Sequence, residues 1–260
     1  MLRRRRRDQP FPDSWRSIIE SRFVPWRTLD DDERARLLEL TREMIDRKTW
    51  EAARGFEITE TMKVTIAVHA ALLILELDHG YYRDVHSIII HPTTVVLTGA
   101  RPAAMAGLAT DAPMPIIGQA RQHGPMVIVW DAVHQQARYS ERGHNVIYHE
   151  FAHKLDMLNG ATDGFPPLAS AEDARRWAEV CTREYELLAE GEGGYLLSSY
   201  GSVNPGEFFA VATEVFFDNP VELQDQKTEL YEVLQSFYRQ DPAGRMRRAA
   251  GHVHHHLAGG

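Results

Sequence analysis

The sequence predicts an α+β fold in which a small mixed sheet, formed near the middle of the chain, is packed with helices. Apolar residues at helical spacing fill residues 30–79 and return after residue 145, and short β-branched runs lie between them. The chain has 260 residues, 43% of them hydrophobic and 25% charged, so it is long enough to bury a sizeable core.

Two helices are expected in the N-terminal part of the chain. Acidic side chains at residues 30–33 suit the start of a helix that we expect to run to about Trp50, because negative charge is favourable at a helix N-terminus. Gly55 then breaks the chain. Thr59 begins a second, mostly buried helix, which is expected to end before Gly80.

Strand signals follow in the middle of the chain. Residues 85–90 and 94–97 are β-branched runs on either side of His91 and Pro92, and residues 126–130 form another short run after Pro125. These runs predict the strands of the sheet.

Helical patterns then continue to about residue 240. We expect Asn145 to cap the first of these helices and Gly160 to stop it. Further helices are predicted at residues 171–190, from Asn204 to about Phe217, and from Pro220 to about residue 240.

We predict a single domain, residues 25–240, with mobile ends. Residues 1–24 hold an arginine run at residues 3–7 and a lead-in, and residues 241–260 hold a tail with histidines at 254–256 and no core pattern. No apolar run follows the arginines, so they are interpreted as a solvated tail rather than as part of a secretion signal.

Composition narrows the classes of function. A net charge of −8 argues against a general nucleic-acid binder, since phosphate contacts need a basic field. The longest apolar stretch, residues 66–77, is about half the length of a membrane span and contains His69 and Glu76. The single cysteine, Cys181, allows neither an intramolecular disulfide nor a thiolate zinc cluster. These features predict a cytoplasmic protein that binds proteins, peptides or small molecules.

The strongest chemical signal is the motif His149-Glu150-Phe151-Ala152-His153. Residues four apart share one face of a helix, so His149 and His153 can direct both imidazoles at one ion, and neutral imidazole is a good zinc ligand. Glu150 lies about 100 degrees round the helix from His149. At that place it can accept a proton from zinc-activated water and relay it to the leaving amine.

The alternative is an exposed helix on which the two histidines have no metal role, because the motif fixes only three residues. The neighbouring residues argue that the helix is embedded, and histidines buried there need polar partners. The apolar neighbours are Val146, Ile147, Phe151, Ala152, Leu155 and Leu158.

A catalytic zinc needs a third protein ligand, for which three carboxylates are candidates. Asp156 lies one turn beyond His153 on the same helix, so its reach to the ion is poor, and orienting a ligand or tying down a loop suits it better. Glu207 lies at the start of a later helix, with Glu214 two turns further on. Residues 204–207 also match a capping box, in which Glu207 would only satisfy a backbone N–H. Ligation and capping both stay open for Glu207 at this point.

Two separate segments resemble the Mlc titration factor A (MtfA) family of bacterial zinc peptidases, which are gluzincins. The segments are HEFAHKLD at residues 149–156 and SYGSVNPGEFFA at residues 199–210, and the same pair is similar to the catalytic domain of anthrax lethal factor. GFEIT at residues 55–59 and the helix at 66–77 extend the resemblance, which covers roughly residues 25–240. It implies a zincin-like metallopeptidase fold whose active-site helix carries the HExxH motif.

The resemblance also implies roles for individual residues. It makes the zinc (Zn²⁺) ligands His149, His153 and Glu207, the general base Glu150, and the oxyanion-stabilising hydroxyl Tyr200. A phenol near zinc donates a hydrogen bond where charge develops, whereas the alternative for Tyr200 is a loop aromatic that packs near Pro205. No role is implied for Glu214, which, like Asp156, stays a candidate for a supporting position beside the ligands.

The implied activity is that of a zinc peptidase, aminopeptidase-like, acting on peptide or protein substrates. In such peptidases the substrate pairs with a sheet edge, for which residues 124–130 are our candidate; an ordinary buried strand is the alternative. The family's named member binds the transcriptional repressor Mlc, so an Mlc-like repressor of sugar-uptake genes is a candidate partner. The alternative function is a regulatory binding module with little or latent catalysis. Because such a module would be free to lose Glu150, its presence favours catalysis.

Overall fold

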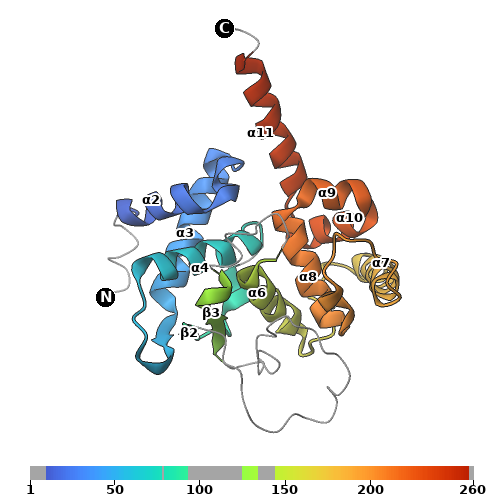
Figure 1. The fold of residues 1–260 in the computed structure, drawn as a ribbon, viewed down its shortest axis with the longest axis horizontal. Helices are drawn as coiled ribbons and strands as arrows, with labels where there is room; N and C mark the ends of the chain where they lie inside the picture. The colour runs from blue at the N-terminus through green and yellow to red at the C-terminus, as the bar shows by residue number, and fades with distance from the viewer. Residues whose placement is uncertain (1–9, 78, 93–124, 134–143, 258–260) are drawn as a thin grey trace.

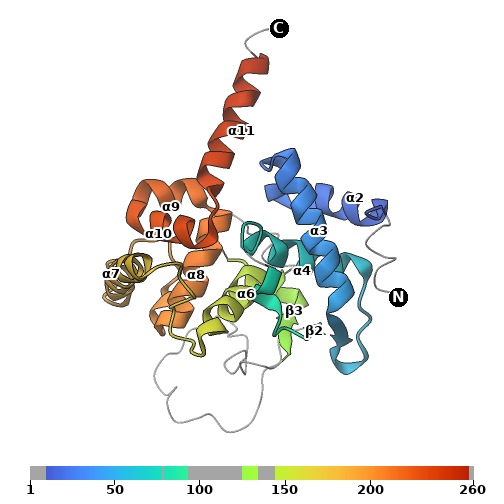
Figure 2. The same ribbon diagram turned by 180° about the vertical axis from the view of Figure 1, so that it is seen from behind.

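The computed structural model describes residues 10–77, 79–92, 125–133 and 144–257 (Figures 1 and 2). Within these ranges the fold is α+β, mostly helical with a small parallel sheet. In both views helices lie on either side of the short strands, and helix α11 extends away from the rest of the molecule. No helix in the described ranges is long and apolar enough to cross a membrane.

The first helices are α2 (Asp13–Arg22), α3 (Asp31–Arg47) and α4 (Glu60–Leu73). Asp30 and Glu33 form a reciprocal capping box at the start of α3, as its acidic first turn predicts. Thr59 caps α4 through the backbone N–H of Met62. The predicted extent of α3 was wrong, because the helix ends at Arg47 and Trp50 lies in a strand that pairs with a distant part of the chain.

The sheet contains strands β1 (Thr49–Ala52), β2 (Ser87–His91) and β3 (Met126–Val129), in the order β1-β2-β3. All pairings are parallel, with Trp50 opposite Ile88 and Ile88 opposite Met126. The mixed sheet that the sequence predicts is therefore wrong for the described strands: α4 lies between β1 and β2 in the chain, and such a crossover returns the chain in the same direction. The predicted strand at 94–97 and Gly124 lie outside the described residues.

Described residues of both terminal segments contact the rest of the fold, and the mobility of these segments stays a prediction. Ile19 of α2 and Phe23 are buried in the common core, and α2 packs against α4. At the other end, α11 (Pro242–Leu257) begins with the buried Ala243, and the side chain of Arg245 donates to Glu33. At the N-terminal end, the contacts with the core are made by apolar residues at helical spacing, Phe11, Trp15, Ile18, Ile19 and Phe23. Residues 1–9 and 258–260 lie outside the described part of the chain.

The C-terminal half consists of α6 (Val146–Asp156), α7 (Ala171–Ala189), α8 (Pro205–Asp218), α9 (Pro220–Gln226) and α10 (Thr228–Tyr238). The single helix expected from Pro220 to about residue 240 is two helices. The break falls at Lys227, whose backbone leaves the helical region (φ −136, ψ 60). Its side chain forms a mostly buried ion pair with Glu184 of α7 at 2.7 Å, so a contact between helices accompanies the break.

Helices α6 and α8 lie side by side at the centre of the C-terminal half (Figure 1). Every residue of α8 from Phe208 to Phe217 is buried, including the polar Thr213 and Glu214. Helix α6 also packs against α4 and β3. The helix that carries the HExxH sequence is thus enclosed on several sides, which holds its side chains in fixed positions.

Candidate metal centre and active site

His149 and His153 lie on one face of α6 and point their imidazoles at a common place. The side chain of Asn145 caps the helix by accepting the backbone N–H of Tyr148, as predicted. The Nε2 atoms of the two histidines are 3.2 Å apart. Helical spacing alone explains this convergence.

Glu207 comes to the same place from the first turn of α8. Asn204 caps α8 by accepting the backbone N–H of Glu207 at 3.0 Å. The Glu207 carboxylate turns to the histidines: its Oε2 atom is 2.9 Å from Nε2 of His149 and 3.3 Å from Nε2 of His153. Asn204 therefore caps the helix, whereas the Glu207 side chain lies with the two histidines.

The three side chains form the kind of group that can hold a metal ion. The candidate ligand atoms of His149, His153 and Glu207 all lie within 4.8 Å of one another, and the described residues contain no other such group. Two imidazole nitrogens and one carboxylate oxygen form a typical catalytic zinc set, which leaves a further coordination position open.

Glu214 fixes the orientation of His149. Its Oε1 atom is 2.6 Å from Nδ1 of His149, and its Oε2 atom accepts the backbone N–H of Asn145 at 2.6 Å. A carboxylate that accepts from Nδ1–H selects the tautomer whose Nε2 is free to bind a metal. On the sequence alone, Glu214 is only a candidate for a supporting position. In the structure its carboxylate contacts the candidate ligand His149 directly.

The carboxylates of Glu207 and Glu214 both contact His149 in a largely buried site. Although burial opposes it, hydrogen bonds to Glu207 and Glu214 raise the pKa of His149 to about 10. Burial also opposes the shift at Glu207, where hydrogen bonds from His149 and His153 lower the pKa to about 2. Carboxylates that hold a proton on an imidazole in this way would also stabilise a metal cation at the same place.

Glu150 is buried beside this cluster, with 3% of its surface exposed. Burial raises the pKa of Glu150 to about 8, against the opposing charge of His149. A carboxylate whose pKa lies near neutrality is suited to accept and return a proton. It comes from the same helix as the histidines but is not a member of the ligand group.

Tyr200 lies on the short 3₁₀ helix η7 (Ser199–Ser202), and its ring centroid is 5.9 Å from that of His149. Burial, and after it the negative charge of Glu207, raise the pKa of the phenol to about 12. The phenol is therefore protonated at neutral pH and faces the cluster, which is the arrangement that an oxyanion donor needs.

Asp156 lies outside the ligand group, at the C-terminal end of α6, and is fully buried. Its carboxylate accepts the backbone N–H groups of Gly164 and Phe165, so it ties the following loop to α6. The sequence did not predict these partners, Gly164 and Phe165, and a loop glycine was the only signal for them. The indole N–H of Trp177, which donates to the carbonyl oxygen of Gly164, was not predicted either.

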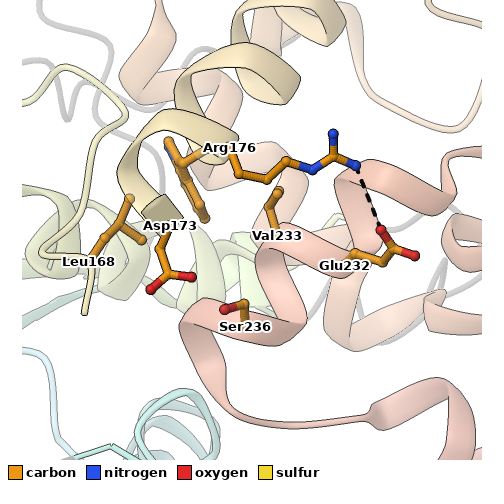
Figure 3. Close-up of a pocket in the computed structure, with 7 residues that line it drawn as sticks. Leu168, Asp173, Arg176, Glu232, Val233 and Ser236 are labelled. Atoms are coloured by element: carbon orange, nitrogen blue, oxygen red, sulfur yellow. Dashed lines mark ion pairs between the residues drawn. The ribbon is translucent and has the colours of Figure 1, made fainter. Parts of the chain in front are cut away.

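A separate pocket lies between α7 and α10 (Figure 3) and contains none of the predicted site residues. Two of its charged side chains, Arg176 and Glu232, are 3.8 Å apart, and Arg176 is also 2.6 Å from Glu229, which does not line the pocket. The pocket is lined by Leu168, Asp173, Arg176, Trp177, Glu232, Val233 and Ser236.

Comparison with known proteins assigns the chain to a family. Residues 1–239 match the family described as glucose-regulated metallo-peptidase M90. Mlc titration factor A of Edwardsiella ictaluri is 35% identical over 224 residues, which cover 84% of each chain, and that of Yersinia pestis is 29% identical over 85% of this chain and 82% of its own. A Synechocystis sp. protein described as uncharacterised is 30% identical over 90% of this chain and 86% of its own. The chain therefore belongs to the glucose-regulated metallo-peptidase M90 family.

Proposed function

We propose that the chain is a zinc-dependent peptidase in which His149, His153 and Glu207 hold the metal and Glu150 is the general base. The observation that carries the proposal is the convergence of the three ligand atoms within 4.8 Å, from two separate helices, beside a buried Glu150. Membership of a metallopeptidase family supports it.

The residues present fit zinc. A set of two imidazole nitrogens and one carboxylate oxygen suits zinc better than magnesium or calcium, which prefer oxygen ligands throughout. His149 is already oriented by Glu214, which is the usual support of a metal-binding histidine. When bound, zinc acts as a Lewis acid that activates water and polarises the scissile carbonyl.

The chain's own residues then perform the proton transfers. The Glu150 carboxylate accepts a proton from the attacking water and delivers it to the nitrogen of the leaving amine. Its burial excludes bulk water, so the proton is not lost between the two steps. The Tyr200 hydroxyl donates a hydrogen bond to the oxygen that becomes negatively charged when the carbonyl is attacked.

The substrate in this proposal is a peptide, cleaved in an aminopeptidase-like manner, that pairs with β3. In the described part of the sheet β3 pairs only with β2, and β3 packs against α6. A peptide added at an edge strand gains backbone hydrogen bonds, while pockets for alternate side chains set specificity.

A second candidate function is regulatory binding of an Mlc-like repressor. The name Mlc titration factor A, carried by several relatives, supports it. The presence of Glu150 and Tyr200 beside the cluster favours catalysis, because repressor binding alone needs neither a general base nor an oxyanion donor.

Removal of the metal tests the proposal directly. Treatment with a strong chelator should abolish hydrolysis of chromogenic aminoacyl and peptide substrates, and one equivalent of zinc should restore it. Metal content and initial rates are measured on the same samples. Hydrolysis that persists after complete metal removal would contradict the proposal.

Tyr200→Phe should lower kcat by about 100- to 1000-fold, the effect of removing one oxyanion donor. KM and zinc content should change little, because the ring remains and the hydroxyl is not a ligand. Steady-state kinetics with a chromogenic peptide and metal analysis check both expectations. A wild-type kcat in Tyr200→Phe would contradict the role as oxyanion donor and would indicate that Tyr200 only packs in the loop.

A further inference from the structure

The loop between α6 and α7 is held at Gly164 from both helices. The Asp156 carboxylate, at the end of α6, accepts the backbone N–H of Gly164 at 2.9 Å and that of Phe165 at 2.8 Å. The indole N–H of Trp177, on α7, donates to the carbonyl oxygen of Gly164 at 2.9 Å. Asp156 and Trp177 are both buried, so these hydrogen bonds are shielded from water and hold the loop backbone in one place.

The same loop lies directly against the first turn of α8. Gly164 has a φ of +74°, and a Cβ atom on it would lie 2.3 Å from the carbonyl oxygen of Pro205. Gly206 is similarly close to the loop, since a Cβ atom there would lie 3.0 Å from Cγ2 of Thr162. At Gly164 the loop backbone therefore meets the backbone of Pro205 with no side chain between them. This contact leaves no room for a side chain at Gly164.

Glu207 follows these two residues of α8 immediately. A continuous path therefore runs from the histidine helix through Asp156 and Gly164 to Pro205 and so to the third candidate ligand. We infer that Asp156 and Gly164 are positioning residues, which set the place of the Glu207 carboxylate relative to the two histidines. The inference rests on the proposed function, because it concerns how well the three ligands are arranged for a metal.

Gly164→Ala is the sharpest test of this path. The added methyl group removes no hydrogen-bonding group, but it forces the loop and Pro205 apart, and we expect Glu207 to shift relative to the histidines as a result. The matched control is Gly55→Ala. Gly55 has nearly the same φ, +72°, so alanine is strained there as well, but a Cβ atom at Gly55 meets nothing within 4 Å. A difference between the two variants isolates the contact with Pro205 from the strain of a positive φ.

The measurements are zinc affinity, by competition with a chromogenic chelator, and the visible absorption of the cobalt-substituted protein. Gly164→Ala should still bind one metal ion, with an affinity about 10- to 100-fold lower, as is usual when the support of a ligand is disturbed. Its cobalt spectrum should differ from that of the wild type, because the spectrum reports the ligand geometry. Gly55→Ala should match the wild type in both measurements.

A double-mutant cycle shows whether the effect passes through Glu207. In a Glu207→Gln background, Gly164→Ala should cause little further loss of zinc affinity, because the ligand that it displaces has already been impaired. Losses that are additive, or an unchanged zinc affinity and cobalt spectrum in Gly164→Ala, would overturn the inference.

Asp156→Asn provides a second variant should Gly164→Ala fail to fold. It keeps the shape of the side chain but removes one of the two oxygens that accept the loop N–H groups. The altered cobalt spectrum and the weaker zinc binding are expected here too, and wild-type values for both would overturn the inference. A wild-type protein that binds no zinc would overturn the proposed function, whereas one that binds zinc with no effect of Asp156→Asn overturns this inference alone.

Discussion

Glu150→Gln is expected to lower kcat for peptide hydrolysis by about 100- to 10,000-fold, the range for loss of a general base, while zinc stays bound. Glutamine has nearly the same shape as glutamate but cannot take up the proton of the attacking water. Because Glu150 is not in the ligand group, the histidine pair and Glu207 are left in place. Steady-state kinetics together with metal analysis measure both parts of the expectation.

Glu184→Gln is a suitable control for this variant. Glu184 is also a buried glutamate, but it pairs with Lys227 rather than with the metal cluster. Its replacement should lower thermal stability and leave kcat near the wild-type value. Equal kcat values for Glu150→Gln and the wild type, both with stoichiometric zinc, would remove Glu150 from catalysis. If both proteins were inactive, the peptidase proposal would fail for those substrates and regulatory binding would be favoured.

Glu207→Ala is expected to lower zinc affinity by more than the roughly 10- to 100-fold loss typical of residues that merely support a ligand. The variant deletes one of the three candidate donors and leaves His149 and His153 as a two-ligand site. Activity should fall with the loss of metal and should recover in part at high zinc concentration. Chelator competition and metal analysis after dialysis measure the effect.

The control for Glu207→Ala is Glu222→Ala. Both residues stand third in a helix that begins with proline after an asparagine, α8 for Glu207 and α9 for Glu222. Removing either carboxylate takes a negative charge from a helix N-terminus, so both variants share that modest cost to stability. Only Glu207→Ala should release zinc. Equal zinc retention in the two variants would contradict ligation by Glu207 and would favour a capping role at the start of α8.

The sequence predicts the parts of the site that depend on local spacing. Four-residue spacing places His149 and His153 together, and Asn145 and Asn204 cap their helices as their sequence positions indicate. The positions of Glu207 and Tyr200 beside the histidines follow from the resemblance to known peptidases rather than from local spacing. In the structure Glu207 is part of the cluster, and the centroid of the Tyr200 ring is 5.9 Å from that of His149.

Features that depend on contacts between distant segments were not predictable in this way. The sequence predicts that Trp50 lies at the end of a helix, but its backbone pairs with a strand nearly forty residues away in the chain. The closeness of Gly164 to Pro205 is set by the packing of three helices, and no local pattern encodes it. Glu214 lies on the expected face of its helix, but only the folded chain shows that its oxygen meets Nδ1 of His149.

Anomalous diffraction from crystals of the zinc-loaded protein tests most directly whether zinc is held by His149, His153 and Glu207. We expect one strong anomalous peak at the zinc edge, about 2.0 to 2.2 Å from Nε2 of both histidines and from a Glu207 carboxylate oxygen. A peak bound by Asp156 in place of Glu207, or one held only by the histidines at residues 254–256, would contradict it.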